Sequence, residues 1–265
     1  MIAYVGIVLA ILMPFFVFLI YVATPLASPV GGHAWTKADD FNSLMAISGT
    51  NIQMPNERDT RVLVLNNLHV TFTSNDRTFN NISTLVDKTN PDLIIVLGNS
   101  VGFWLNDVST TRLINKMDSF EIPWAITINQ FDTRGKATRN RLAYMFEDSA
   151  FGLFQFGPRD LYNVSGNYFI NLLRGSQIVH TLFMMGSGRG DTTFQNEWFY
   201  WAINGNRALS ADLKYTVFKG DTHPTFIPTG IGWTSRSYTK NEPRGGTLLS
   251  IDPLNGSTIT EKFVL

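Results

Sequence analysis

The chain has 265 residues, of which 44% are hydrophobic, and this length suits one large domain or two small ones. Its 21 basic and 21 acidic residues cancel, and no basic stripe is visible, so the sequence argues against a nucleic-acid partner. The lack of cysteine excludes a disulfide framework and a thiolate metal site. A domain of this size can still be stable without disulfides.

The N-terminal segment is hydrophobic, and no charged side chain precedes Lys37. A transmembrane helix needs about 20 apolar residues, whereas the apolar part of a signal peptide has about 7–15. Because residues 1–26 are almost continuously apolar, we expect residues 1–27 to form an uncleaved signal anchor. Cleavage near Leu26–Ser28, where the side chains are small, is the alternative.

Three N-x-S/T sequons follow the hydrophobic segment, at Asn81, Asn163 and Asn255. Such triplets are common by chance and say little on their own. Behind a membrane anchor they favour a glycoprotein whose domain lies in a lumen or outside the cell. We therefore expect a single-pass membrane protein that contacts the membrane through its N-terminal helix.

Residues 28–60 are rich in Ser, Gly, Asn and Asp and are predicted to be a stalk and lead-in. Short apolar runs then alternate with segments of helical spacing. Strands are predicted at Arg61–Leu65, Pro91–Gly98 and Pro123–Ile128, and helices at Thr78–Lys88, Val108–Met117 and Lys136–Phe146. This alternation is typical of βαβ units and a parallel sheet.

The second half of the chain is richer in predicted strands. One helix is expected at Asp191–Ile203. The strand-like segments are Asn167–Leu173, Gln177–Met185, Lys214–Gly220, Gly246–Asp252 and Ser257–Leu265. We expect these strands to form a second sheet, mixed or antiparallel.

Asparagine follows each of the three predicted parallel strands. In open α/β sheets, ligands bind at the carboxyl ends of the strands, so one crevice can gather side chains from these loops. The candidates are Asn67, His69, Asn99, Asn129 and Gln130, joined by Asp221 and His223 from a fourth loop. Any single asparagine here is better explained by a turn, but four such loops, one with D-x-H spacing, favour a site.

Four short motifs occur in a fixed order: NLH at Asn67–His69, GNS at Gly98–Ser100, INQ at Ile128–Gln130 and GDTH at Gly220–His223. This order resembles the calcineurin-like metallophosphoesterase superfamily, in the branch near the purple acid phosphatases. The corresponding motifs there read D-x-H, G-D-x, G-N-H and G-H-x-H. Flanking segments such as GPRDLYNVSGNYFI and RGGTLLSIDPLNGSTI also resemble that branch.

The resemblance covers residues 61–265 and implies an α/β fold, an αββα sandwich of two mixed sheets. With the predicted transmembrane helix in front, the expected organisation is a signal anchor at 1–27, a stalk and lead-in at 28–60, and a phosphoesterase-type domain at 61–265. The implied metal-ligand positions are Asn67, His69, Asn99, Asn129, Asp221 and His223. Gln130 stands at the position of the catalytic histidine.

The departures from the family pattern remove charge. Asn67 and Asn99 replace two aspartates, Asp221 replaces a histidine, and the segment with a lone histidine has no counterpart in the sequence. Two metal ions roughly 3.5–4 Å apart need anionic ligands to offset their repulsion, and an amide oxygen is neutral. We therefore expect no intact catalytic residue, and no cofactor beyond at most one weakly bound divalent metal ion.

The sequence favours a membrane-anchored pseudophosphatase that serves as a binding or scaffold module for an unknown protein or phosphorylated ligand. The alternative is a metal-dependent phosphoesterase with a rebuilt, possibly mononuclear site. A third hypothesis is an adhesion protein that uses the Arg-Gly-Asp triplet at Arg189–Asp191, although a turn is the better explanation of that triplet.

Overall fold

The computed structural model describes residues 12–17, 40–73, 75–102, 104–158, 165–186, 193–219 and 245–265. The chain divides into two compact units, Met1–Gly32 and His33–Leu265. In the first unit, residues 12–17 are helical. Within the described ranges, no helix is both long and apolar enough to cross a membrane. Most of the segment 1–27 lies outside those ranges, so the transmembrane helix stays a prediction.

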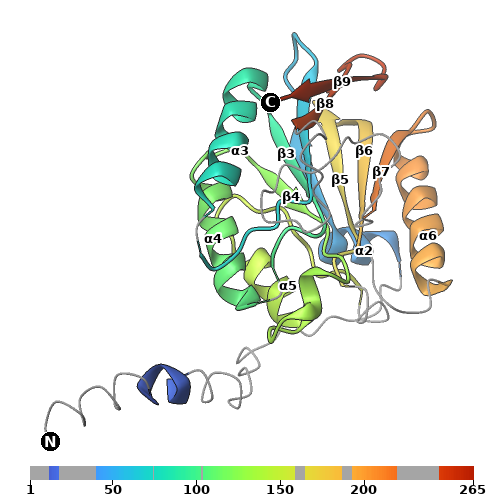
Figure 1. The fold of residues 1–265 in the computed structure, drawn as a ribbon. Coiled ribbons are helices and arrows are strands. Elements are labelled where there is room, and N and C mark those ends of the chain that lie inside the picture. The colour runs from blue at the N-terminus through green and yellow to red at the C-terminus, as the bar shows by residue number, and fades with distance from the viewer. Residues whose placement is uncertain are drawn as a thin grey trace, which may run out of the picture. The chain divides into compact units, whose positions relative to one another are not determined.

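The second unit has the predicted α/β class (Figure 1). Its helices are α2 (Phe41–Ser48), α3 (Asp76–Thr89), α4 (Asn106–Asp118), α5 (Arg139–Glu147) and α6 (Thr193–Leu209), with a 3-10 turn η1 (Asp132–Arg134). Its strands are β1 (Gly49–Gln53), β2 (Thr60–Asn66), β3 (Leu93–Leu97), β4 (Trp124–Ile126), β5 (Tyr168–Arg174), β6 (Gln177–Met185), β7 (Lys214–Lys219), β8 (Gly245–Ile251) and β9 (Thr258–Val264). The strands and helices predicted after residue 60 are found, with ends that differ by at most three residues, except that α6 continues six residues beyond its predicted end.

The first sheet has the order β4-β3-β2-β8-β9. β2, β3 and β4 are parallel, as the βαβ pattern predicts. β8 is antiparallel to β2, and β9 is antiparallel to β8. The assignment of these last two strands to the second sheet was therefore wrong. Both faces of β8 are buried, except at Ser250. A strand that is buried on both faces fits the interior of either sheet. Its hydrophobic pattern therefore does not identify the strand it pairs with.

The second sheet has the order β1-β5-β6-β7, with β1 parallel to β5. Residues 41–53, predicted to belong to the stalk and lead-in, thus form α2 and β1 of the folded unit. α2 begins where the Asp40 side chain accepts the backbone N–H of Ser43 at 2.8 Å, a typical N-cap. Its Leu44 packs with Phe169 of β5 and Trp198 of α6 in one hydrophobic cluster.

The two sheets lie between helices. Figure 1 shows α3 and α4 on the side of the first sheet and α6 on the side of the second. Tyr168 of β5 joins the sheets, because its hydroxyl donates to the carbonyl of Ile126 at 2.9 Å and accepts the N–H of the same residue at 3.1 Å. Both sheets are mixed in strand direction, as predicted.

His180 of β6 makes a second link between the sheets. Its Nδ1 lies 2.9 Å from the carbonyl oxygen of Gly256, in the turn between β8 and β9, and its Nε2 lies 2.9 Å from the Thr216 hydroxyl of β7. Because a carbonyl only accepts, Nδ1 carries the proton. Burial lowers the pKa of His180 to about 4, so the imidazole is neutral at pH 7.

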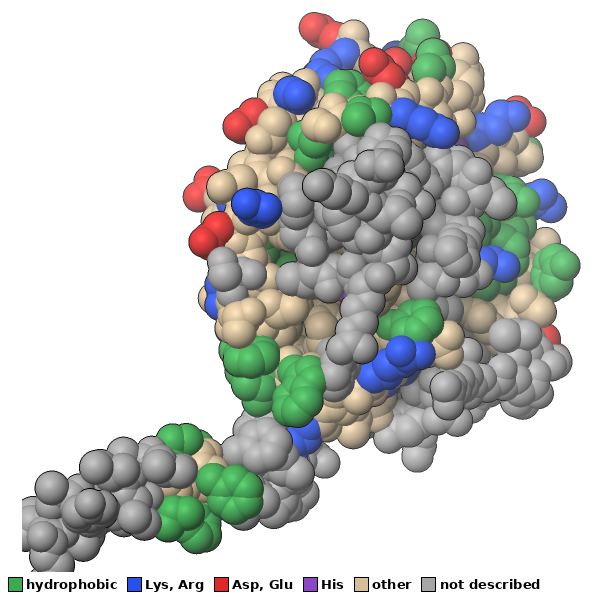
Figure 2. Space-filling view, viewed as in Figure 1, with side chains coloured by type: hydrophobic (Ala, Val, Ile, Leu, Met, Phe, Trp, Pro, Cys, Tyr) green, Lys and Arg blue, Asp and Glu red, His purple; other side chains and the backbone are tan. Residues whose placement is uncertain are grey.

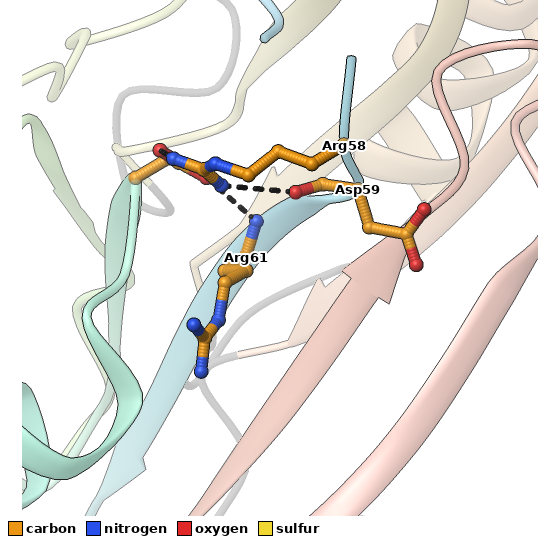
Figure 3. Close-up of polar contacts among 4 residues, drawn as sticks. Arg58, Asp59 and Arg61 are labelled. Atoms are coloured by element: carbon orange, nitrogen blue, oxygen red, sulfur yellow. Dashed lines mark hydrogen bonds and ion pairs between the residues drawn. The ribbon is translucent and has the colours of Figure 1, made fainter.

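The described surface carries charges of both signs, and acidic and basic side chains are interspersed on the face seen in Figure 2. Arg58 and Asp92 form an ion pair at the N-terminal ends of β2 and β3, with nitrogen–oxygen distances of 2.7 and 2.6 Å. Figure 3 shows Arg58 beside Asp59 and Arg61 at the start of β2, where Arg58 also donates to the carbonyl of Asp59 at 3.1 Å. The Asp92 carboxylate also accepts the N–H of Arg61 at 2.9 Å. Asp92 thus links the start of β3 to the start of β2, at the end opposite to the candidate site.

Candidate functional site

The loops after β2 and β3 run side by side. The N–H of His69 donates to the carbonyl of Asn99 at 3.3 Å, and that of Val70 donates to Ser100 at 2.8 Å. Because β2, β3 and β4 are parallel, their C-terminal ends share one edge of the sheet. The strand order thereby brings together side chains that are distant in sequence, as expected for an α/β sheet.

Asn67, His69 and Asn99 form what we call the Asn-His cluster. Nδ2 of Asn99 donates to Oδ1 of Asn67 at 2.9 Å and lies 2.9 Å from Nε2 of His69. An amide nitrogen only donates, so Nε2 accepts in this arrangement and the imidazole proton lies on Nδ1. Burial lowers the pKa of His69 to about 4. The cluster is therefore uncharged at pH 7.

The backbone of the Asn-His cluster is left-handed at all three residues. The φ angles are 51° at Asn67, 47° at His69 and 62° at Asn99. Asparagine and histidine adopt this region more readily than most residues with a side chain, yet each such residue still costs on the order of 1 kcal/mol. The asparagines therefore also serve as turn residues, which agrees with the simpler explanation of asparagine after a strand.

Asp132 holds the loops after β3 and β4 together. Its carboxylate, 2% exposed, accepts four backbone N–H groups. Oδ2 accepts from Asn99 at 3.0 Å and from Asn129 at 2.9 Å, and Oδ1 accepts from Ser100 at 2.6 Å and from Val101 at 3.0 Å. Burial raises the pKa of Asp132, and the four N–H donors act against this rise. With two donors on each oxygen, the arrangement fits the ionised carboxylate.

The sequence analysis missed Asp132, although a local signal was present. Asn129 and Asp132 bond reciprocally: Oδ1 of Asn129 accepts the N–H of Asp132 at 3.2 Å, and Asp132 accepts the N–H of Asn129. This is the pattern of a capping box, with the spacing N-x-x-D. That spacing marks the turn, but it does not reveal that the same carboxylate binds the loop after β3.

Asn129 lies at the same sheet edge, but its side chain turns toward its own loop. Its Oδ1 also accepts the N–H of Phe131 at 2.7 Å. Its Nδ2 is buried and has no hydrogen-bond partner among the described residues. A Cβ atom on Gly98 would lie 2.5 Å from the Cβ of Asn129, so the glycine makes room for this side chain.

Only some of the other predicted site residues lie among those that the structure describes. Gln130 is half-buried in the turn after β4, where its carbonyl accepts the Thr133 hydroxyl at 3.1 Å. Asn81 is half-buried on α3, and Asn255 is exposed between β8 and β9. Outside the described residues lie Asn163, Asp221, His223 and the triplet Arg189–Asp191.

The described residues do not fit a two-metal centre. Among them, no group of three or more His, Cys, Asp or Glu side chains could hold a metal ion. The Asn-His cluster offers two amides and a neutral imidazole. The N–H₂ group of Asn99 bonds to Oδ1 of Asn67 and Nε2 of His69, the two acceptors that could otherwise bind a cation. The carboxylate of Asp132 is engaged by four N–H groups.

The chain has no match among protein families or curated proteins. Membership of the calcineurin-like metallophosphoesterase superfamily therefore stays a proposal that depends on the order of the motifs.

Proposed function

We propose that the chain is a non-catalytic member of the calcineurin-like metallophosphoesterase superfamily that acts as a binding or scaffold module. The observation that carries this proposal is the Asn-His cluster. Where the family pattern has metal ligands, this chain has three uncharged side chains joined by 2.9 Å hydrogen bonds. The layering of two mixed sheets between helices (Figure 1) agrees with the αββα sandwich of that family.

The loss of charge removes each part of the family's chemistry. Asn67 and Asn99 supply no negative charge to hold two dications together. Gln130 cannot take up or release a proton near neutral pH, as an imidazole does. Loss of one general acid or base costs roughly 10²–10⁴-fold in rate. These effects together leave a fold that retains the shape of the site without its reaction.

The membrane location is part of the same proposal. The uncharged, hydrophobic residues 1–26 are long enough to span a bilayer as a helix. Asn255 lies exposed in a turn, where an attached glycan meets no packed surface. Both features suit a domain that is anchored in the membrane and faces a lumen or the cell exterior.

The decisive experiment is elemental analysis of the purified full-length chain in detergent, combined with a phosphatase assay on p-nitrophenyl phosphate. We expect metal content near the background and no hydrolysis that a chelator abolishes. Two tightly held metal ions with chelator-sensitive turnover would overturn the proposal. One bound ion with turnover would instead establish the mononuclear phosphoesterase, in which His69 acts with Asp221 and His223.

A further inference from the structure

Two aromatic side chains are exposed on the loops that carry the Asn-His cluster. Phe72 is 41% exposed and Trp104 is 54% exposed. The N–H of Gly102 donates to the carbonyl of Val70 at 2.8 Å, so the chain segments that lead to the two aromatics are neighbours. Val108, in the first turn of α4, is also 43% exposed.

Hydrogen bonds from Asn75 and Arg112 hold the loop that carries Phe72. The buried Asn75 side chain accepts the N–H of Thr71 at 2.9 Å and donates to the carbonyl of Thr71 at 2.6 Å. Arg112 of α4 donates to the carbonyl of Phe72 at 3.0 Å. A surface that is fixed before binding loses little conformational entropy when a ligand arrives. These contacts are therefore typical of a preformed binding surface.

The Asn-His cluster keeps hydrogen-bonding capacity for a ligand. Its internal bonds use Oδ1 of Asn67 and Nδ2 of Asn99. The remaining amide atoms are a donor, Nδ2 of Asn67, and an acceptor, Oδ1 of Asn99. A hydroxyl group both donates and accepts, so it matches such a pair. A phosphate, in contrast, needs cations or several convergent N–H groups, whereas Nε2 of His69 is an acceptor in this arrangement.

We propose that Phe72, Trp104, Asn67 and Asn99, which we call the aromatic–amide surface, bind an uncharged carbohydrate. A sugar ring has an apolar face that packs on an aromatic ring, and a polar rim that bonds to the amides. Phe72 follows Asn67 by five residues and Trp104 follows Asn99 by five, a reach of at most about 17 Å of extended chain. An oligosaccharide can therefore contact both parts of the surface.

The amides distinguish this ligand from a protein partner. Exposed aromatics alone also suit a protein interface, whereas an uncharged donor and acceptor on the same two loops suit a ligand rich in hydroxyl groups. The nearest charges do not change this conclusion. Asp132 is enclosed by backbone N–H groups. Arg112 donates to the carbonyl of Phe72, and the Asp107 carboxylate accepts the N–H of Val108 at 2.9 Å at the start of α4.

The test uses the full-length chain in detergent and an array of neutral glycans, followed by titration of neutral trisaccharides of mannose and of N-acetylglucosamine. Glucose 6-phosphate and mannose 6-phosphate serve as the charged probes. We expect the wild type to retain at least one neutral glycan and neither sugar phosphate. Retention of charged sugars only, of no glycan, or of a protein partner through Trp104 in place of a glycan would overturn the proposal.

Two variants test the two parts of the aromatic–amide surface. Trp104→Ala removes the exposed ring, and Asn67→Gly removes an amide while keeping a residue that adopts a positive φ without strain. Each should weaken glycan binding roughly tenfold or more, a loss of about 1.4 kcal/mol or more, because each removes a central contact of a small binding surface. Tyr200→Ala, which removes a 66% exposed ring on α6, should leave the affinity within about twofold, since it lies outside the surface.

This inference depends on the proposed function, because it assumes that the Asn-His cluster binds no metal. The two can fail separately. Glycan binding together with chelator-sensitive phosphatase activity would overturn the proposed function alone. Absence of both glycan binding and metal would overturn the carbohydrate site alone. Glycan binding that is unchanged in Trp104→Ala and in Asn67→Gly would also overturn it.

Discussion

Nδ2 of Asn99 donates a 2.9 Å hydrogen bond to Oδ1 of Asn67 across the C-terminal ends of two parallel strands. The two residues are therefore coupled, because an aspartate at both positions would replace this attraction with a contact between carboxylate oxygens. Two carboxylates at such a distance cannot both ionise without a compensating cation. Restoring the family's acidic residues thus makes the stability of the fold depend on a bound ion.

We expect the triple variant Asn67→Asp, Asn99→Asp, Gln130→His to bind about one divalent ion per chain and to show no phosphatase activity. The two new carboxylates with His69 supply ligands for one ion, but Asp221 still replaces a histidine and the lone histidine is still missing. Elemental analysis and thermal unfolding with and without Mn²⁺ should show a metal-dependent rise in the unfolding temperature. The single variant Gln130→His adds no carboxylate, so it should show no such rise. Chelator-sensitive turnover by the triple variant would contradict this prediction.

Replacing Asp132 should be among the most destabilising changes in the chain. Asp132→Ala leaves four buried N–H groups without their acceptor, and loss of one member of a buried charged network costs roughly 3–5 kcal/mol in the free energy of unfolding. Asp132→Asn should also be destabilising, because its amide N–H₂ would face N–H donors. Urea denaturation measures both variants. Asp212→Ala, at an exposed position, is the control, and equal stability of Asp132→Ala and Asp212→Ala would disprove this role of Asp132.

Stability should fall as the pH is lowered from about 6.5 toward 4. Burial lowers the pKa values of His69 and His180 to about 4 in the folded state, whereas an unfolded histidine titrates near 6.5. The unfolded chain therefore binds more protons within this window, and each histidine contributes a slope of at most about 1.4 kcal/mol per pH unit. Above pH 6.5 this contribution is fully present. Denaturation curves at pH 5, 6 and 7 measure the slope.

The variant His69→Asn assigns part of that slope to the Asn-His cluster. Asparagine tolerates the positive φ at this position and does not titrate. We expect the slope between pH 5 and 6 to decrease by about the contribution of one histidine. Asn204→Gln, at an exposed position of α6, is the control, because it changes no titrating group and should leave the slope unchanged. Equal slopes in the wild type and in His69→Asn would contradict the prediction.

The exposed sequon at Asn255 should carry a glycan in a glycosylating host. Its side chain lies in the turn after β8, where Nδ2 donates to the Asp252 carboxylate at 3.0 Å and is accessible to solvent. Endoglycosidase treatment should increase the gel mobility of the wild type, and Asn255→Gln should remove one step of this shift. Asn204→Gln, an exposed asparagine outside any sequon, should not. If no glycan is found at any of the three sequons, the predicted orientation loses its main support.

The sequence predicted the strands near the site because they are buried on both faces. β2 carries an apolar run that ends before Asn66 and Asn67, and β3 is an apolar run that Gly98 and Asn99 follow. The parallel strand order then brings Asn67 and Asn99 together. β1 could not be predicted in the same way. Its residues are half-exposed or exposed, so neither alternation nor a continuous apolar run distinguishes it from a loop.

The partners of a residue were harder to predict than its secondary structure. β8 pairs with the edge of β2 that β3 leaves free. The sequence of β8 does not show which strand will have a free edge. The role of Asp132 depends on N–H groups of a loop that lies 31 to 33 residues earlier in the chain. Local periodicity carries no information on either relationship.

The 2.6 Å hydrogen bond from the N–H of Ser100 to Asp132 bears on the chemical durability of the protein. Asparagine deamidates when the backbone nitrogen of the following residue loses its proton and attacks the side-chain carbonyl carbon. The nitrogen that would attack Asn99 is the backbone nitrogen of Ser100, and its hydrogen bond to the Asp132 carboxylate disfavours loss of its proton. Spontaneous ageing therefore does not readily convert Asn99 into aspartate, and the neutrality of the site persists over the lifetime of the molecule.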